Sequence, residues 1–463
     1  MKSAVPKVLH ELCGRSLLGH VLASAREIDP EQLLVVVGHG RDAVTEHLGQ
    51  IDPAAKAVVQ EPQRGTGHAV RTVIEATGAP TGTVVVGYGD IPLLRGETLA
   101  QLTAAHEAAG NAVTILSAEV PDPSGYGRVV RDTAGAVREI VEHKDATLAQ
   151  RDIREINSGV YAFDGALLAA AIARLSTDNA QGEEYLTDAF GILRGDGHLV
   201  GAVIAADHTD ILGINDRVQL AEVRRLRNER LLEHWMREGV TVVDPRTTWL
   251  DVDVTFEPDV VVQPNAHVRG RTHVSGGAEI GPDVTLTDTH VGSGASVRNA
   301  VCQAAEIGPD AVVGPFTYLR PGTKLSRKAK TGAYVETKNA EVGESAKVPH
   351  LTYLGDATIG TGANIGAATV VVNYDGQEKN HTTVGAHARI GSDTMLVAPV
   401  RVGDGAYTAA GTVVTEDVPP GALAVARGRQ HNAEGWVERK RSGTRSAEAA
   451  RRANREIEDT SEE

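Results

Sequence analysis

The sequence predicts two fold classes in series, an α/β doubly wound sheet of nucleotide-binding (Rossmann-like) type in the first half of the chain and a parallel β-helix in the second. In the first half, short apolar segments alternate with amphipathic segments of helical length, which is typical of a mostly parallel sheet covered by helices. In the second half, from about Val260 to Val414, an aliphatic residue returns at every sixth position. That period fits neither an α-helix nor a flat strand, and it is typical of hexapeptide coils that stack and bury a shared aliphatic column.

Length and composition limit the class of protein. With 463 residues the chain exceeds the usual size of one core, so we expect two or more domains. The formal net charge of −15 argues against general nucleic-acid binding, and no apolar run reaches the roughly 18 residues of a transmembrane helix. No apolar signal segment follows Met1, and Cys13 and Cys302 form neither a metal motif nor a disulfide framework. We therefore expect a cytoplasmic protein without membrane or nucleic-acid partners, in which each cysteine is a small buried hydrophobic residue.

The elements of the first half follow from apolar runs and their spacing. We expect strands at residues 33–37, 57–60, 83–86, 112–118 and 199–205. We expect helices at residues 19–26, 43–48, 68–76, 98–109 and 165–175. In such sheets ligands bind beyond the carboxyl ends of the strands, so the loops at those ends are the candidate sites.

Three loops in the first half carry residues suited to a nucleotide phosphate. Asp90 follows the strand at 83–86 and is placed to hold Mg²⁺, which takes one or two carboxylates together with substrate phosphates, although an aspartate there also suits a turn or a helix cap. The segment from Gln60 to His68 opens a helix with Gly65-Thr66-Gly67, whose backbone N–H groups suit an anion or the edge of a base. Lys7 is placed to neutralise phosphate, but a solitary lysine is also a common surface residue.

A connector and the hexapeptide columns follow. Residues 215–238 are rich in Arg, Glu and Leu at helical spacing and predict a long amphipathic helix whose charges form a solvated face, with Gly239 at its end. The rhythm falters between Ser326 and Thr383. The aliphatic members of the columns are Val262, Val268, Val274, Ile280 and Leu286; Val301, Ile307, Val313, Leu319 and Leu325; Val342, Val348 and Leu354; and Val384, Ile390, Leu396 and Val402.

Arg320 and Lys338 are candidates for an anion site on the coils. Three hexapeptides make one triangular coil, so we expect residues 18 positions apart to lie above one another. Arg320 and Lys338 have this separation, and Thr331 and Thr337 at inward positions allow the register to hold between them. Two stacked cations repel unless an anion bridges them, so we interpret the pair as a phosphate clamp. The alternative is two solvated surface cations.

His350 lies in the stretch where the rhythm falters. The same stretch holds Asn364, Lys379 and the turn sequence Asn373-Tyr374-Asp375-Gly376, which predicts a loop that leaves the coil. An isolated histidine is more often structural than catalytic, but a histidine that titrates near neutral pH is the natural base for an amine. We therefore regard His350 as a candidate general base.

Taken together, the motifs of the first half have the order and spacing of a sugar-phosphate nucleotidylyltransferase. They are Lys7, Gln60 with Gly65-Thr66, Tyr88-Gly89-Asp90, Gly125-Tyr126-Gly127-Arg128, Val141-Glu142-His143-Lys144, Glu155-Ile156-Asn157-Ser158-Gly159 and Gly213-Ile214-Asn215-Asp216. More narrowly, both halves of the chain resemble the bacterial bifunctional family that combines N-acetylglucosamine-1-phosphate uridylyltransferase with glucosamine-1-phosphate N-acetyltransferase. The resemblance implies synthesis of UDP-N-acetylglucosamine, a precursor of cell-wall peptidoglycan. Acetyl-CoA acetylates glucosamine 1-phosphate, and the product then attacks the α-phosphorus of UTP, which releases pyrophosphate.

The resemblance also assigns roles to residues of the first half. Asp90 and Asn215 hold Mg²⁺ by this resemblance, which supplies charge neutralisation for the uridylyl transfer. The implied contacts with UTP and the sugar nucleotide are Lys7, Gln60, Gly65, Thr66, Tyr88, Gly89, Gly127, Glu142, Asn157 and Asn215.

For the second half, the resemblance implies a left-handed β-helix and a homotrimer with acetyl-transfer sites between subunits. His350 is the implied general base that takes a proton from the sugar amine. The implied contacts with glucosamine 1-phosphate are Arg320, Lys338, Tyr353, Asn364 and Lys379, with Tyr374 assisting. The implied contacts with acetyl-CoA are Ala367, Asn373, Tyr374, Ser392, Ala410 and Arg427. Ala368 stands where the family usually has glycine, so we expect a mild change of local backbone shape there.

The expected domains are a uridylyltransferase domain at 1–217, a linker helix at 218–240, an N-acetyltransferase β-helix at 241–430 and, at 431–463, an arm around Trp436 followed by a disordered tail. The family opens with a strand and a Gly-rich loop, and Met1 aligns with the last residue of that loop. We expect a sheet without this strand to have two new edges and the polypeptide as written to show little uridylyl transfer. Two alternatives stay open: an acetyltransferase with an inactive first domain, and a nucleotidylyltransferase-like subunit without chemistry.

Overall fold

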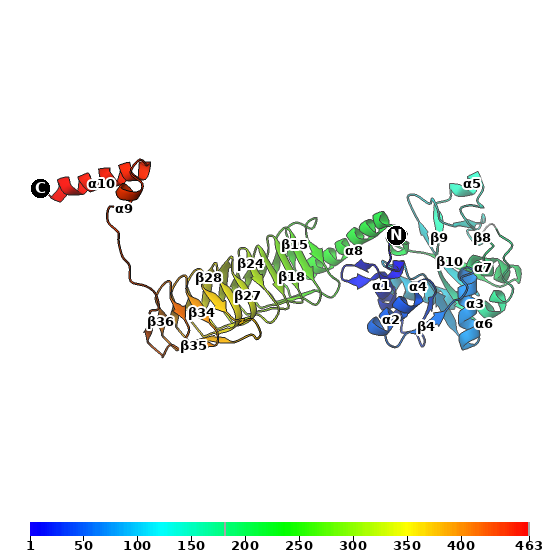
Figure 1. Cartoon of the computed structure of the whole chain (residues 1–463). Coiled ribbons are helices and arrows are strands. Elements are labelled where there is room, and N and C mark those ends of the chain that lie inside the picture. The colour runs from blue at the N-terminus through cyan, green and yellow to red at the C-terminus, as the bar shows by residue number, and fades with distance from the viewer. Residues whose placement is uncertain (180–181, 462–463) are drawn as a thin grey trace. The chain divides into compact units, whose positions relative to one another are not determined.

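The structure is a computed structural model that describes residues 1–179 and 182–461. It forms two compact units, Met1–Thr323 and Lys324–Glu463, and each is described by itself (Figure 1). The boundary between the units falls among the coils of the β-helix. The domain boundaries expected from the sequence, at 217, 240 and 430, lie elsewhere and stay predictions. They are close to the ends of secondary-structure elements, since a long helix spans Arg217–Arg237 and the coil strands run from Thr241 to Ala424.

The first unit opens with an α/β domain and a connecting helix. Its elements are η1 (Lys7–Leu9), β1 (Glu11–Leu12), β2 (Arg15–Ser16), α1 (Leu17–Arg26), β3 (Leu34–Val37), α2 (Arg41–Ile51), β4 (Lys56–Val59), α3 (Thr66–Thr77), β5 (Thr83–Val86), α4 (Gly96–Ala109), β6 (Val113–Glu119), β7 (Arg128–Arg131), β8 (Val137–Val141), α5 (Leu148–Arg151), β9 (Glu155–Asp164), α6 (Gly165–Ile172), α7 (Leu186–Gly195), β10 (Val200–Ile204), η2 (His208–Ile211) and α8 (Arg217–Arg237). All predicted strands and helices of this half are confirmed, with ends that differ by at most three residues.

The sheet is built around β9, a strand that the sequence analysis did not place. β6 and β5 both pair with β9 in the antiparallel sense, and β10 pairs in parallel with β6. Successive residues of β9 enter different cores: Tyr161 and Phe163 pack with α6 and α7, whereas Val160 and Ala162 pack with α4 and β6. Helices therefore cover both faces of the sheet, as a doubly wound arrangement requires. The expectation of a mostly parallel sheet is wrong for this larger sheet, because four of the five strand pairings that its described residues form are antiparallel.

The sheet is divided into two pieces. β3 and β4 pair in parallel as a separate two-stranded sheet, and β5 pairs with β9 in the larger one. Among the described residues no strand pairs with the second edge of β3 or of β5. The structure thus shows the two free edges that were expected of a sheet without a strand between them.

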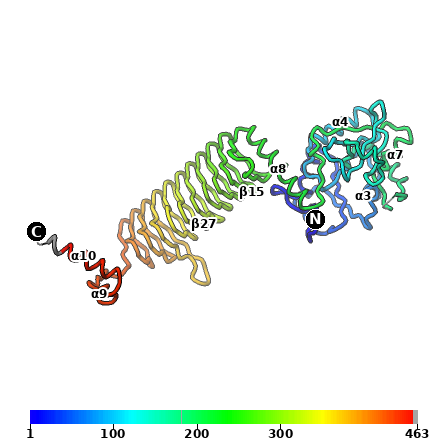
Figure 2. The backbone as a smooth tube through the Cα atoms, turned by 90° about the horizontal axis from the view of Figure 1, so that it is seen from above, coloured from blue at the N-terminus to red at the C-terminus, as the bar shows by residue number. Residues whose placement is uncertain are grey.

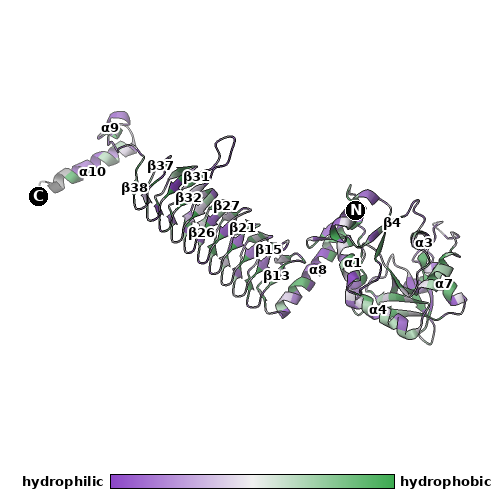
Figure 3. Cartoon of the chain, turned by 90° about the horizontal axis from the view of Figure 1, so that it is seen from below, coloured by the Kyte–Doolittle hydropathy of each residue, from purple (hydrophilic) through white to green (hydrophobic). Residues whose placement is uncertain are grey.

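α8 carries both hydrophilic and hydrophobic residues (Figure 3), and Leu220, Val223 and Leu232 are buried. Buried Asn228 donates to the Thr248 carbonyl at 2.8 Å and accepts from the Leu250 N–H at 2.9 Å, which fixes α8 to the first coil. The guanidinium of Arg224 donates to the Glu11 carbonyl at 2.9 Å. The expectation that the charges of this helix only face solvent is wrong, because several of them bond to neighbouring segments.

Stacked parallel strands follow in both units. In the first unit they are β11 (Thr241–Val242), β12 (Trp249–Leu250), β13 (Thr255–Phe256), β14 (Val261–Val262), β15 (Ala266–Arg269), β16 (His273–Val274), β17 (Glu279–Ile280), β18 (Val284–Thr287), β19 (His290–Val291), β20 (Ser296–Val297), β21 (Ala300–Gln303), β22 (Glu306–Ile307), β23 (Val312–Val313) and β24 (Thr317–Leu319). In the second unit they are β25 (Lys324–Leu325), β26 (Lys330–Ala333), β27 (Glu336–Val342), β28 (Lys347–His350), β29 (Tyr353–Ile359), β30 (Asn364–Ile365), β31 (Val370–Val372), β32 (Thr382–Val384), β33 (Arg389–Ile390), β34 (Met395–Val397), β35 (Val400–Val402), β36 (Tyr407–Thr408), β37 (Val413–Val414) and β38 (Leu423–Ala424).

The aliphatic columns are confirmed with one exception. The predicted column residues are buried, and inward Thr331 and Thr337 are fully buried as well. The assignment of Val301 to the column is wrong, because Val301 is 39% exposed and the neighbouring Cys302 is fully buried in its place. The cause is the register, which pairs Leu286 with Cys302 in a coil that is shorter than 18 residues. Burial also raises the pKa of Cys302 to about 12, as expected for an unreactive thiol.

Coil length varies along the β-helix. Residues 18 apart pair in the first coils, as with Trp249 and His267, but the offset is 17 between Val301 and Tyr318 and again between Lys324 and Glu341. Where the loop at Asn373 leaves the coil, the offset is 25, as with Asn364 and Arg389, and the strands on either side still pair in register (Figure 2). The rule of 18 therefore describes only some of the coils.

The C-terminal segment differs from the expected disordered tail. It contains two helices, α9 (Trp436–Lys440) and α10 (Arg445–Ser461), which contact each other. Ala447 is fully buried, and alanine, arginine and glutamate, which make up most of α10, are strong helix formers. Positions 462–463 of the predicted tail lie outside the described residues. Within residues 1–179 and 182–461, every helix is too short or too polar to be a membrane span.

Candidate functional sites

Lys7, Asp90 and Asn215 meet in the first unit, although they come from three distant segments. Lys7 lies on η1, Asp90 in the turn after β5, and Asn215 in the turn before α8. The Lys7 ammonium forms an ion pair with the Asp90 carboxylate and lies 3.1 Å from the amide oxygen of Asn215. The Ile214 N–H donates to the Asp90 carbonyl at 3.1 Å, which holds the two turns together. One cation thus already contacts an oxygen atom of each predicted metal ligand.

The loop from Gln60 to Thr66 opens α3 as predicted. The amide of Gln60 donates to the Gly65 carbonyl at 3.0 Å, and the Thr66 hydroxyl accepts from the Leu186 N–H at 3.1 Å. Gly65 has φ +108°, and a Cβ there would lie 2.5 Å from the Glu184 carbonyl oxygen, so glycine is required. Beside Gln60 lies a cleft of about 630 Å³, lined also by Pro6, residues 38–43 and residues 61–63.

The residues predicted to hold the sugar also lie together. The Asn157 N–H donates to the Gly127 carbonyl at 2.8 Å, and a Cβ on Gly127 would lie 3.4 Å from both carboxylate oxygens of Glu142. Burial, with smaller effects from Asp145 and Asp188, raises the pKa of the Glu142 carboxyl. On the strand that carries Asn157, Gly159 leaves room for Tyr88, since a Cβ there would lie 2.0 Å from the Tyr88 ring, and Gly89 links that tyrosine to Asp90.

In the second unit, Tyr353 and Asn373 converge over Gly355. A Cβ on Gly355 would lie 2.5 Å from the Tyr353 hydroxyl and 2.6 Å from the Asn373 amide nitrogen. The same amide donates to one carboxylate oxygen of Asp356 at 2.6 Å, and the Asn339 amide donates to the other at 2.7 Å. Asp356 therefore fixes Asn373, which is 8% exposed, in one orientation.

Lys338 and Lys379 surround the same carboxylate. Burial alone would raise the pKa of Asp356, but hydrogen bonds from two asparagine amides and the charges of both lysines outweigh it and lower the pKa. Lys338 pairs in register with Gly355 on the neighbouring strand. In the loop, the backbones of Lys379 and Tyr374 form an isolated antiparallel β-bridge, and the Tyr374 hydroxyl donates to the Gly376 carbonyl at 2.7 Å. Cationic and amide groups thus gather where a phosphate-bearing sugar was predicted to bind.

His350 and Asn364 lie on strands next to this group. His350 ends β28, is exposed, and pairs in register with Ala333. Asn364 lies on β30 and pairs with Lys347 on one side and with Arg389 on the other. An exposed imidazole at a strand end is open to a substrate.

Four of the six predicted acetyl-CoA residues form one column along successive coils, and the other two, Asn373 and Tyr374, lie in the loop after β31. The Asp393 N–H donates to the Ala367 carbonyl at 2.7 Å, and the Gly411 N–H donates to the Ser392 carbonyl at 2.8 Å. The Arg427 guanidinium donates to the Ala410 carbonyl at 3.0 Å. Ala367, Ser392, Ala410 and Arg427 are therefore neighbours in space although they span many residues of sequence.

Ala368, where the family pattern has glycine, keeps the backbone shape of a glycine. Its φ is +59°, in the left-handed region that costs an alanine roughly 1–2 kcal/mol. The alanine is therefore strained, and the expected change of local shape relative to the family stays a prediction.

The proposed clamp of Arg320 and Lys338 stays a prediction. Arg320 belongs to the first unit and Lys338 to the second. On each side of the boundary the nearest pairings have an offset of 17 residues, so the expected separation of 18 is not the local rule.

Sequence reasoning missed several residues that support these sites, above all Asp356 and Gly355 beside Asn373, and Asp210 near the turn of Asn215. An aspartate in a turn has no distinctive pattern, and the partners of these residues lie far away in sequence. For Gly355, its place inside an otherwise regular strand was an available signal.

The chain is similar to known proteins over nearly its whole length. Residues 1–178 match the family described as MobA-like NTP transferase domain. The chain is 65% identical over 460 residues to a "Bifunctional protein GlmU" of Streptomyces avermitilis, which covers 99% of this chain and 95% of the relative. It is 64% identical to the protein of that name from Thermobifida fusca, over 98% of this chain and 94% of the relative. The identity to the Corynebacterium glutamicum protein of that name is 52%, over 98% of this chain and 94% of the relative.

Proposed function

The chain belongs to the family of bifunctional GlmU proteins, and from this premise we propose how its residues divide the two reactions of the family. The protein is an acetyltransferase and a uridylyltransferase: it acetylates glucosamine 1-phosphate with acetyl-CoA and then forms UDP-N-acetylglucosamine from UTP, with release of pyrophosphate. This product is a precursor for cell-wall synthesis. The full-length similarity supports the bifunctional reading over an acetyltransferase alone or a subunit without chemistry, and it also argues against the expectation of little uridylyl transfer.

For uridylyl transfer, we assign Mg²⁺ to Asp90 and Asn215. One carboxylate oxygen and one amide oxygen are hard donors of the type Mg²⁺ accepts, and the Lys7 ammonium contacts both of them. Mg²⁺ commonly takes its other ligands from substrate phosphates and water, so one carboxylate and one amide from the protein suffice. When bound, the ion neutralises charge on the phosphates.

The chain's own groups bind and orient the substrates around this position. Lys7 neutralises a phosphate once it leaves Asp90, and the N–H groups at the start of α3 take the base beside the cleft at Gln60. Gly127, Glu142 and Asn157 hold the sugar, and Gly127 leaves open the space in front of the Glu142 carboxylate. Positioning and charge stabilisation supply most of the catalysis in phosphoryl-type transfer.

For acetyl transfer, His350 is the general base that takes a proton from the sugar amine as that amine attacks the thioester. Lys338 and Lys379 neutralise the sugar phosphate, Tyr353 and Asn364 orient the ring, and Asn373 contacts acetyl-CoA. The column Ala367, Ser392, Ala410 and Arg427 is the path of acetyl-CoA. The observation that carries this assignment is the convergence of Tyr353, Asn373 and two lysines around Asp356.

We further propose that the protein is a cytoplasmic homotrimer. Tyr334 and Leu351 are 61% and 59% exposed, and they follow Ala333 and His350, which pair in register on neighbouring coils. Two large apolar side chains beside the general base form a patch that a second copy of the chain would cover. Sedimentation of the wild type and of Leu351→Lys tests this: we expect a trimer for the first and a smaller species for the second. A wild-type monomer would contradict the proposal.

Two assays on the same protein test the division of labour. Thiol release from acetyl-CoA with glucosamine 1-phosphate measures the first reaction, and pyrophosphate release from UTP with N-acetylglucosamine 1-phosphate measures the second. We expect His350→Ala to lower acetyl transfer by about 100- to 10,000-fold with uridylyl transfer unchanged. We expect Asp90→Asn to do the reverse. Each variant is the other's control, and a parallel loss of both activities in either variant would contradict the assigned roles.

A further inference from the structure

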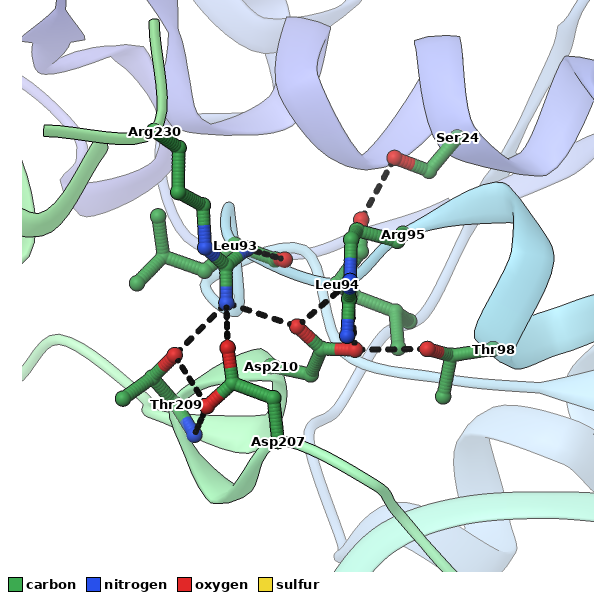
Figure 4. Close-up of polar contacts among 9 residues, drawn as sticks. All are labelled: Ser24, Leu93, Leu94, Arg95, Thr98, Asp207, Thr209, Asp210 and Arg230. Atoms are coloured by element: carbon green, nitrogen blue, oxygen red, sulfur yellow. Dashed lines mark hydrogen bonds and ion pairs between the residues drawn. The ribbon is translucent and has the colours of Figure 1, made fainter. Parts of the chain in front are cut away.

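A buried carboxylate, Asp210, joins the segments that follow the proposed metal ligands Asp90 and Asn215. Asp210 belongs to the short helix η2, and its side chain is fully buried. It accepts bonds from the Arg95 Nε at 3.0 and 3.1 Å, from Arg230 at 2.7 Å and from the Thr98 hydroxyl (Figure 4). Two guanidinium groups and a hydroxyl therefore satisfy one buried charge, which is the condition under which such a charge is tolerated.

The three partners come from three separate segments. Arg95 and Thr98 lie at the start of α4, directly after the turn that carries Asp90. Arg230 lies on α8, the helix that begins just after Asn215, and it also donates to the Leu93 carbonyl at 2.7 Å, the Thr209 hydroxyl at 2.6 Å and the Asp207 carboxylate at 2.8 Å. Figure 4 shows these groups directed toward one another around Asp210 and Arg230.

The same segments also meet at the proposed metal position. The Ile214 N–H donates to the Asp90 carbonyl, and the Asp216 side chain accepts from the Val218 and Gln219 N–H groups at the start of α8. Two connections therefore join the segment that carries Asp90 to the segment that carries Asn215. The first is the hydrogen bond from Ile214 to Asp90, and the second is the set of bonds that Arg95, Thr98 and Arg230 make to Asp210. Removing the Asp210 charge would take from Arg95 the carboxylate that it binds and leave Arg230 with Asp207 alone, which would weaken the link between the two segments.

We propose that Asp210, with Arg95 and Arg230, is a positioning group that sets the spacing of Asp90 and Asn215 and thereby the affinity of the uridylyltransferase site for its divalent cation. Asp210 does not contact the reacting atoms and acts only through the two turns. The inference rests on the proposed function, since it assumes that Asp90 and Asn215 are the ligands. Residues that orient metal ligands typically change metal affinity or activity by about 10- to 100-fold when they are replaced.

The test measures cation binding directly in the full-length protein. Mn²⁺ is titrated into protein with UTP present, and free Mn²⁺ is followed by its electron paramagnetic resonance signal, in the wild type, Asp210→Asn and Thr98→Val. Thr98→Val removes one hydroxyl donor at nearly constant shape, so it remains informative if Asp210→Asn folds poorly. We expect Mn²⁺ affinity to fall about tenfold in Asp210→Asn and by a smaller factor in Thr98→Val. Acetyl transfer in the same samples should stay unchanged.

Two further variants separate the possible failures. Asp52→Asn removes a carboxylate that Arg26 binds through two bonds of 2.9 Å and that is not hydrogen-bonded to Asp90, Asp210 or Asn215, and it should leave Mn²⁺ affinity at the wild-type value. Asp90→Asn removes the proposed ligand itself. If Asp90→Asn binds Mn²⁺ as the wild type does, the proposed metal site is wrong. If Asp90→Asn loses Mn²⁺ but Asp210→Asn and Thr98→Val keep wild-type affinity, the positioning role is overturned and Asp210 is purely structural.

Discussion

Replacing Gly355 with alanine is expected to lower acetyl transfer while uridylyl transfer stays intact. The added Cβ would lie 2.5 Å from the Tyr353 hydroxyl and 2.6 Å from the Asn373 amide, whereas ordinary contact begins at 3.4 Å. The two side-chain ends must therefore retreat by about 0.9 and 0.8 Å, the differences between these distances. The nearest atoms to this Cβ all belong to side chains and none to the backbone, so the chain should fold normally.

The size of the effect follows from these displacements. A misplacement of about 1 Å in a group that positions a substrate can cost about 100-fold in rate. Because both side chains relax in part, we expect acetyl transfer by Gly355→Ala to fall by about 10- to 100-fold, with the change mainly in kcat/KM for glucosamine 1-phosphate.

Thiol release from acetyl-CoA measures the loss, and pyrophosphate release from UTP gives the internal reference. Gly443→Ala is the matched control, because its Cβ would meet nothing within 4 Å in the same unit, so both activities should remain. Acetyl transfer by Gly355→Ala within twofold of the wild type would refute the idea that Tyr353 and Asn373 must converge.

Three further predictions concern stability, pH and the carboxylate beside Asn373. Ala368→Gly should stabilise the protein by about 1 kcal/mol in denaturant unfolding, because it relieves the φ of +59°, whereas Ala386→Gly, whose φ is not positive, should destabilise it. Burial lowers the pKa of His20 from 6.5 to about 4, so the unfolded state binds the proton first as the pH falls. The free energy of unfolding should be at its full value above pH 6.5 and fall by about 3 kcal/mol as the pH drops toward 4. Thermal unfolding at several pH values measures this slope, which His20→Gln should remove. Asp356→Asn should lower acetyl transfer about tenfold and spare uridylyl transfer, since an asparagine places an N–H₂ group against the Asn373 amide; equal losses in the two assays would show a general folding defect.

The aliphatic columns were predictable because burial selects them at a fixed spacing. Ile280 and Leu396, for example, are buried as the rhythm requires. The register was not predictable, because a coil closes with 16, 17, 18, 20 or 25 residues by changing its turns, as the pairings of Leu286 with Cys302 and Asn364 with Arg389 illustrate. That freedom is why Val301 was misplaced by one position.

The site residues divide in the same way. Asp90, Asn215 and Asn373 lie in turn motifs whose order along the chain was informative, and the structure brings each of them to predicted neighbours. The roles of Asp210 and Asp356 were not predictable, because each depends on a partner that is distant in sequence. The partner of Asp210 is Arg230, and the partner of Asp356 is Asn373. A hydrogen bond between residues far apart in sequence leaves no periodic signal.

The coil that takes 25 residues has a consequence for how such a fold can change. Its strands keep their place in the stack, as Val370 opposite Met395 shows, while the extra residues leave the coil as the loop at Asn373. The rise of a solenoid is set by the spacing of hydrogen-bonded strands and is independent of the length of any single turn. During evolution, one turn of a coil can therefore become longer and acquire new functional residues while the neighbouring coils keep their structure. In this protein, the loop at Asn373 interrupts the repeat, and it is the place where substrate specificity could change without loss of the fold.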